Sequence, residues 1–335
     1  MKLSISRFDN ERDSREWDAL CRAAPMATFL HTRAFLSYHG DRFEDASRVL
    51  RDERGLMIAV LPAARQPGQS DTVCTHPGAS FGGLVHAGDL LGEDLIKALA
   101  MICMDYRGSG FSSLRYKLTP HIYHRWPADD DRYALWRLGA GATQYRCDLS
   151  SAIDLAARGT PNSRRRRALR NAQTAALTIH DDTTKLESFW HVLAANLAER
   201  HDAKPVHSLQ EIQLLAGRFP DEIALLTAQV SGNIEAGVLL FLSARVCHAQ
   251  YIACSAAGRA VNALDALFEQ GIHKAHQLGC RYFDFGISNE DEGRHLNTGL
   301  YQFKSEFGGG GVAHAFYDLP LDAKLAESCD AILKN

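Results

Sequence analysis

One stretch near the C-terminus gathers the side chains best suited to chemistry. Asp284 is the single acid in an alternating aromatic run, and such alternation predicts a buried strand that carries one carboxylate. A polar loop follows at residues 287–297 and contains Glu290 and His295. Carboxylate and imidazole groups can take a proton from an amine, so these three side chains are candidate bases. Asp284 is explained equally well as a structural acid that accepts hydrogen bonds from loop N–H groups.

Lys304 follows this loop within a segment of helical spacing. Leu300, Phe303 and Phe307 recur every three or four residues, and four glycines at residues 308–311 end the segment. Because Phe303 and Phe307 must pack against a core, we expect Lys304 at the rim of that core. A lysine in such a place either extends its ammonium group to solvent or supplies a cation to a site.

This order of residues resembles the Fem-like branch of the GNAT acyltransferase superfamily. The branch includes the FemA, FemB and FemX peptidoglycan aminoacyltransferases and shorter BioF2-like relatives. The resemblance is carried by Asp284-Phe285-Gly286, Gly299-Leu300, Phe303-Lys304 and Phe307-Gly308. It implies an enzyme that transfers an acyl group to an amine. It also implies that Lys304 lies in the reaction channel, where a cation stabilises the developing oxyanion.

The elements around these motifs predict an α/β (α+β) chain of two GNAT-like lobes, residues 1–143 and 144–335. Each lobe is expected to be a mixed, largely antiparallel sheet flanked by helices, and the second should carry the catalytic site. A chain of 335 residues is also too long for one small core. Three apolar strands, a glycine turn and a helix give the second lobe its GNAT order, at residues 223–230, 235–243, 247–254, 255–262 and 263–278.

The glycine turn after the third of these strands is the expected donor site. The GNAT resemblance implies that the pyrophosphate of acyl-CoA, such as acetyl-CoA, binds backbone N–H groups at a helix N-terminus there. The residues assigned to it are Ser255, Gly258, Arg259 and Asn262, and Asn262 with Asp265 fits an N-cap pair. A full Gln/Arg-x-x-Gly-x-Gly/Ala loop is absent, so a plain strand–helix connection stays an open alternative.

Basic residues at the end of the preceding long helix, near residue 200, are the candidate acceptor site. Such a density of basic and imidazole groups is costly to bury without a partner. It indicates either an exposed helix exit or a site for an anionic acceptor, as in FemX-like relatives. The substrate-binding candidates are Arg200, His201, Lys204 and His207, with Asn297 from the polar loop. A second basic run, Arg164 to Arg167, is either a solvated helix face or another anion site.

Composition narrows the classes of function. The formal net charge of −3 gives no overall attraction to DNA. The eight cysteines include no CxxC pair, which favours buried thiols in a reducing compartment over a metal site. We also find no apolar run of membrane-spanning or signal-peptide length, so a cytoplasmic protein without a membrane span is expected.

These observations predict an N-acyltransferase that moves an acetyl or other small acyl group from acyl-CoA to an amine. The preferred acceptor is an amino sugar on a nucleotide or lipid carrier, used for cell-surface polysaccharide. Two alternatives stay open. One is a FemX-like aminoacyltransferase for peptidoglycan, which would take aminoacyl-tRNA as its donor. The other is a non-catalytic scaffold that has kept the fold.

Overall fold

The computed structural model describes residues 2–139, 143–201 and 204–334, apart from the side chains of residues 200 and 201. The chain forms two units. The first consists of Met1–Asp148, Glu292–Arg294 and Ala313–Asn335, and the second of Leu149–Asp291 and His295–Val312. This division differs from the expected one, which placed all of residues 144–335 in the second lobe. The C-terminal segment belongs to the first unit because its apolar side chains complete that unit's core.

The first unit contains two groups of paired strands. β1 (Ser4–Arg7), β2 (Arg48–Arg51), β3 (Met57–Leu61) and β6 (Val85–His86) form an antiparallel sheet in that order. The second group follows the order β4 (Ala64–Gln66), β5 (Gln69–Cys74), β7 (Ser113–Lys117) and β16 (Gly310–Pro320). Val49, Leu50, Val60 and Leu61 are buried in adjacent positions of β2 and β3, so both faces of this pair are covered.

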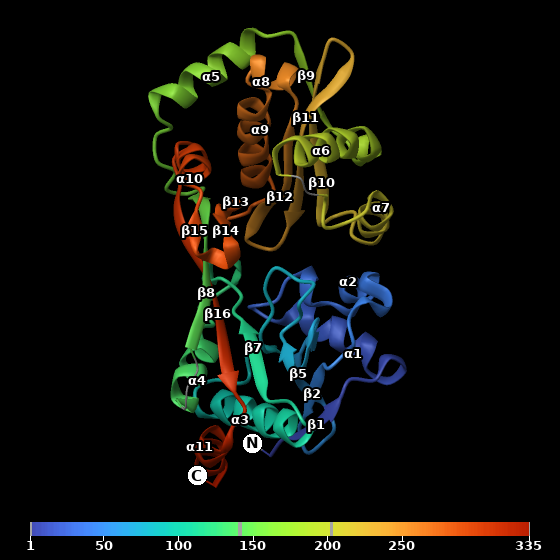
Figure 1. The fold of residues 1–335 in the computed structure, drawn as a ribbon, viewed down its shortest axis with the longest axis vertical. Coiled ribbons are helices and arrows are strands. Elements are labelled where there is room, and N and C mark those ends of the chain that lie inside the picture. Colours follow the sequence, from blue (N-terminus) through green and yellow to red (C-terminus); the bar gives the residue numbers. More distant parts are fainter. Residues whose placement is uncertain (1, 140–142, 202–203, 335) are drawn as a thin grey trace. The chain divides into compact units, whose positions relative to one another are not determined.

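Helices cover these strands. α1 (Asn10–Ala23) begins where the Asp9 carboxylate accepts the N–H of Arg12, and the short α2 (Arg33–Leu36) follows. α3 (Glu93–Gly108) packs beside α11 (Ala323–Lys334), as Figure 1 shows, and α4 (Asp130–Leu138) joins the same core. The apolar side chains of α3 recur on one face and meet Leu325, Cys329 and Ile332 of α11 in a continuous cluster.

The second unit is built on six strands in the order β8-β13-β12-β11-β10-β9. Their neighbouring pairs are antiparallel, except that β12 and β13 run parallel. The bounds are β8 (Thr143–Asp154), β9 (Leu177–Asp181), β10 (Ile223–Val230), β11 (Asn233–Leu242), β12 (Val246–Cys254) and β13 (Tyr282–Ile287). β10, β11 and β12 are rich in buried apolar residues, as the sequence predicts.

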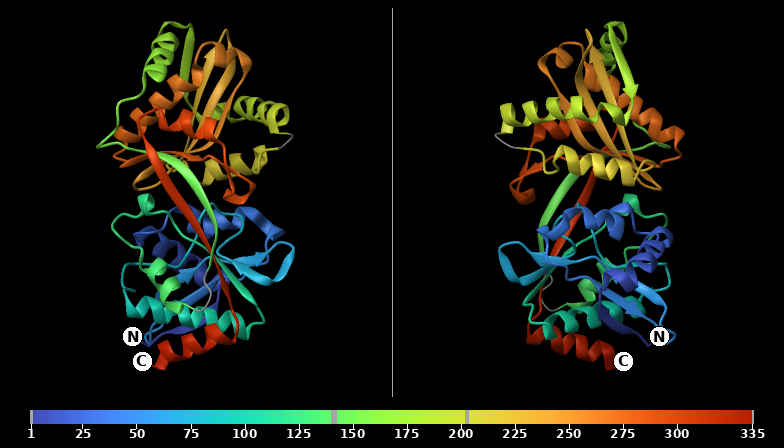
Figure 2. Two further views of the ribbon diagram at one scale, coloured as in Figure 1. Left: turned by 60° about the vertical axis from the view of Figure 1, so that its left-hand side comes forward. Right: turned by 90° about the vertical axis from the view of Figure 1, so that its right-hand side faces the viewer.

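Helices lie on both faces of this sheet (Figures 1 and 2). α9 (Ala263–Gln277) packs its apolar face on β10, β11 and β12, and Phe268 meets Phe283 and Phe285 of β13. α6 (Leu186–His201) and α7 (Leu209–Arg218) cover the opposite face. The remaining elements are α5 (Ser163–Thr174), α8 (Ala256–Ala260), the hairpin β14 (Asn289–Glu290) and β15 (His295–Leu296), and α10 (Thr298–Ser305).

The N-cap predicted for Asn262 is wrong in its chemistry. Asn262 does precede α9, but it has φ 56° and its side chain makes no capping hydrogen bond. The partner proposed for it, Asp265, forms an ion pair with Arg165 instead. A cap pair and a long-range ion pair need the same residue types, so the local sequence could not separate them.

Candidate active site

The site begins where two parallel strands separate. β12 and β13 pair over three residues each, and the last paired positions are His248 and Asp284. β13 then turns at Gly286, whose φ is +77°, while β12 continues to Cys254. A glycine accepts this left-handed conformation at low cost. The strand ends therefore diverge, and backbone groups beyond Asp284 become available to side chains.

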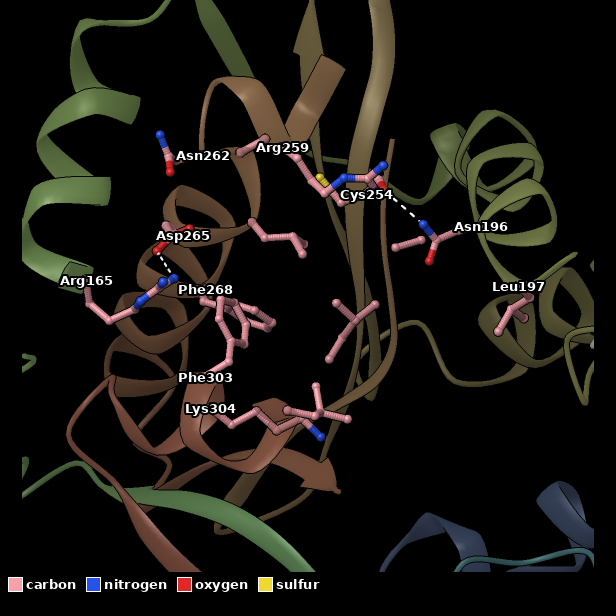
Figure 3. Close-up of a pocket in the computed structure, with 15 residues that line it drawn as sticks. Arg165, Asn196, Leu197, Cys254, Arg259, Asn262, Asp265, Phe268, Phe303 and Lys304 are labelled. Carbon is pink, nitrogen blue, oxygen red and sulfur yellow. Dashed lines mark hydrogen bonds and ion pairs between the residues drawn. The ribbon is translucent and has the colours of Figure 1, made fainter. Parts of the chain in front are cut away.

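A pocket of about 510 Å³ lies beside the diverging strands. Figure 3 shows its wall, which combines the end of β12, the start of α9, one face of α10 and two residues of α6. Most of the lining residues are apolar, and the polar and charged ones are Arg165, Asn196, Arg259, Asn262, Asp265 and Lys304. The lining residues are Arg165, Asn196, Leu197, Ile252, Ala253, Cys254, Arg259, Asn262, Ala263, Leu264, Asp265, Phe268, Leu300, Phe303 and Lys304.

Lys304 is a buried cation of this pocket, with only 4% of its surface exposed. Its Nζ donates to the carbonyl oxygens of Gly286 at 3.0 Å and Ile287 at 2.6 Å. Burial lowers the pKa of Lys304 to about 8, although the nearby Asp284 carboxylate opposes this. An ammonium group has three N–H donors. Two are directed at β13, so one remains for a group in the pocket.

Asp284 is completely buried and is held by two donors. Its Oδ1 accepts the backbone N–H of Gly286 at 2.9 Å, and its Oδ2 lies 2.9 Å from Nδ1 of His248. The His248 side chain is 19% exposed. Lys304, Asp284 and His248 are thus connected through one backbone residue, Gly286.

The predicted donor residues gather at the other end of the pocket. Arg259 and Asn262 line it, and Arg259 donates from Nη1 to the Cys254 carbonyl at 2.7 Å. Ser255 and Gly258 support the turn, since the Ser255 hydroxyl accepts the N–H of Gly258 at 3.1 Å and caps α8. A Cβ at Gly258 would lie 2.7 Å from the carbonyl oxygen of Glu235. Glycine is therefore required here to let the turn approach β11.

An arginine from α5 forms the adjacent wall. Arg165 places Nη1 2.5 Å from Oδ1 of Asp265 on α9 and Nε 3.2 Å from Oε2 of Glu306 beside α10. Its guanidinium also stacks 4.6 Å from the centre of the Phe303 ring. Burial raises the pKa of the Asp265 carboxyl, and Arg165 opposes that effect. One of the four arginines of the Arg164–Arg167 run is thus buried and paired inside the unit, while the other three are exposed.

The other candidates lie apart from the pocket lining. Glu290 and His295 face each other as exposed partners in the β14–β15 hairpin. Asn297 caps α10 through the N–H of Leu300 and donates to Glu290. Lys204 is exposed, and His207 is buried with Nδ1 2.5 Å from the Tyr251 hydroxyl. The side chains of Arg200 and His201 lie outside the described residues.

Three kinds of site residue escaped the sequence analysis. Asn196 and Leu197 lie on an amphipathic helix whose periodicity does not show which part meets a pocket. Asp265 was assigned to a cap. His248 lies in a largely apolar strand, and its polar side chain within that strand was the available signal. Across the described residues, no cluster of His, Cys, Asp and Glu could hold a metal ion, and no helix is long and apolar enough to cross a membrane.

Comparison with known proteins places this site in a family. Residues 160–304 match the family model of the acetyltransferase (GNAT) domain. FemX is 13% identical and aligns over 97% of this chain and 99% of its own, with a TM-score of 0.67. L-PGS from Bacillus licheniformis is 11% identical and aligns over 98% of this chain and 98% of its own, with a TM-score of 0.62. A tandem GNAT protein from the clavulanic acid biosynthesis pathway, solved without AcCoA, is 12% identical and aligns over 96% of this chain and 99% of its own, with a TM-score of 0.53.

At such low identities the structural likenesses show the fold. The sequence has no match among curated proteins. Residues 160–304 thus match a GNAT acetyltransferase domain, and the chain as a whole shares its fold with FemX and L-PGS. The resemblance stated from the sequence is confirmed, as are the α/β (α+β) fold class and the expectation of an enzyme, an acyltransferase. This finding favours an enzyme over a non-catalytic scaffold.

Proposed function

We propose that this acyltransferase moves an acetyl or other small acyl group from acyl-CoA to the amine of an amino sugar. The observation that carries the proposal is the pocket beside the diverging strands, which joins a turn at a helix N-terminus to a buried ammonium group. The first N–H groups of α9, those of Ala263 and Leu264, have no carbonyl partner within a helix and lie in the pocket wall. Together with Arg259 they suit the phosphates of the donor.

Lys304 would act on the reacting carbonyl. When an amine attacks a thioester, negative charge develops on the carbonyl oxygen, and a fixed donor in a site with little water stabilises it. The third N–H of Lys304 is available for this purpose. The role requires the protonated form, and the pKa of Lys304 is about 8. Activity should therefore fall as the pH rises through about 8.

The acceptor proposal rests on α6. Asn196 and Leu197 line the pocket, and α6 ends at His201, so Arg200, His201 and Lys204 follow within a few residues. Cations at this distance along the chain suit the phosphates of a nucleotide- or lipid-linked sugar. The tandem GNAT protein named above, whose structure was solved without AcCoA, supports a CoA donor for a chain of this architecture.

A titration and a variant test the proposal. Calorimetry should detect acetyl-CoA binding, and Lys304→Met should retain that binding while turnover, followed as free thiol released in the presence of amino sugars, falls by about 10²–10³-fold. Lys324→Met, which changes an exposed lysine of α11, is the matched control and should behave like the wild type. Binding of aminoacyl-tRNA without binding of acetyl-CoA would instead favour the FemX-like reaction.

A further inference from the structure

His248 and Asp284 form a pair whose hydrogen bonding fixes the imidazole. A carboxylate can only accept, so the contact of 2.9 Å between Asp284 Oδ2 and His248 Nδ1 places a proton on Nδ1. In the neutral ring, Nε2 then carries the lone pair. Among the described residues, Nε2 donates to and accepts from no partner within hydrogen-bonding distance. The Asp284 contact at Nδ1 therefore fixes the orientation of the ring, and Nε2 can accept a proton.

Neither member of the pair lines the 510 Å³ pocket, but the pair is linked to residues that do. His248 and Asp284 are the last paired residues of β12 and β13, and Ile252 lines the pocket four residues further along β12. The ring passes close to Gly286, where an added Cβ would lie 3.3 Å from Cε1. The carbonyl of that same glycine accepts from Lys304. The charged groups that the contacts bring near the ring are thus Asp284 from β13 and, across Gly286, Lys304 from α10.

Exposure separates the candidate bases. Asp284 is 0% exposed and already accepts two hydrogen bonds, so its oxygens face protein donors. The His248 side chain keeps 19% of its surface exposed and has a free lone pair. A base must come within hydrogen-bonding reach of the proton that it removes. Of these two residues, only His248 meets that condition.

We propose that His248 accepts the proton of the acceptor amine during acyl transfer and that Asp284 is the positioning residue that holds its tautomer. This inference rests on the proposed function. The amine nitrogen forms a C–N bond to the thioester carbon, and its proton passes to Nε2 of His248. The C–S bond then breaks, and the sulfur leaves as a thiolate that takes this proton from the imidazolium. The ring returns to its neutral state.

The experiment compares three histidine variants by turnover and donor binding. His248→Asn keeps a side-chain N–H for Asp284 but has no atom in the place of Nε2, and His248→Ala leaves space for added imidazole. We expect the Asn variant to bind acetyl-CoA normally and to lose about 10²–10⁴-fold in turnover. His276→Asn, at an exposed position of α9, is the control.

Imidazole rescue separates a chemical role from a structural one. Added imidazole should raise the turnover of His248→Ala and leave His248→Asn unchanged. Asp284→Asn should keep donor binding but change the ¹⁵N chemical shifts of His248 toward a mixture of tautomers. Normal turnover in a folded His248→Asn protein overturns the inference, and so does slow turnover of His248→Ala that added imidazole fails to raise. A failure of the proposed donor shows differently, as absent acetyl-CoA binding by the wild type.

Discussion

Single residues set the electrostatics of this site through burial. Lys304 is almost fully covered, yet the carbonyls of Gly286 and Ile287 satisfy two of its N–H groups. The sequence indicated a lysine at the rim of a core because Phe303 and Phe307 had to pack. It could not indicate these carbonyl partners, since they become available only where β13 leaves β12. The residue type was predictable, and the depth of burial was not.

Burial of Lys304 should make the stability of the protein depend on pH in the alkaline range. The pKa of Lys304 falls from 10.5 to about 8 on folding. Between these values the unfolded chain holds one more proton than the folded protein, so the free energy of unfolding increases as the pH rises. At ~1.4 kcal/mol per pH unit the total is roughly 3 kcal/mol. Urea unfolding of the wild type and Lys304→Met at several pH values should show this difference, and parallel curves would contradict it.

At the scale of elements, the end of β13 organises the site. Gly286 has φ +77°, and an added Cβ would lie 3.3 Å from Cε1 of His248. Gly279, which follows α9, has a similar φ of +75° but open space around its Cα. The two glycines therefore share a backbone constraint and differ in what surrounds them.

Alanine substitutions at these glycines should separate the two effects. Both variants place a Cβ in a left-handed conformation and should lose about 1 kcal/mol or more of unfolding free energy. Gly286→Ala must also displace the His248 ring, so its turnover should fall while Gly279→Ala keeps wild-type turnover. Thermal unfolding and acetyl-transfer assays on both proteins measure this. Equal turnover in the two variants would show that the ring tolerates the added methyl group.

The helices and strands of the second unit were largely predictable, whereas their pairing was not. The apolar runs of β10, β11 and β12 and the amphipathic α9 appear close to their expected bounds. The pair of His248 and Asp284 depends on the register between strands 36 residues apart in sequence. Alternation indicates which face of a strand a side chain occupies, but it says nothing of which residue lies opposite.

At the scale of the whole molecule, the chain forms two units, and each unit is built from segments that are separated in the sequence. Local patterns indicated a change of unit near residue 143. They could not indicate that β16 and α11 return to the first core. The apolar positions Leu325, Cys329 and Ile332 of α11 suit any nearby core equally well, and only packing against α3 decides between them.

Removal of α11 should therefore weaken the first unit selectively. A chain that ends at Leu321 exposes the α3 surface that Leu325, Cys329 and Ile332 cover, and each lost contact of a buried aliphatic residue costs about 2–5 kcal/mol. Hydrogen exchange should show faster exchange of α3 amides, while β10 to β12 keep their protection. The change Lys324→Met within the full chain serves as a control. Unchanged protection of α3 would mean that α11 adds little to the core.

The ion pairs that Arg165 forms in the pocket wall limit how this sequence can change during evolution. Its guanidinium pairs with Asp265 on α9 and with Glu306, which follows α10. Loss of Arg165 leaves the buried Asp265 carboxylate without its ion-pair partner, at about 3–5 kcal/mol. Simultaneous replacement by apolar side chains is much less costly. The three positions should therefore be inherited together. A related sequence with a neutral residue in place of Asp265 should therefore also lack Arg165. A search for runs of basic residues would then not find this site, although the site is still intact.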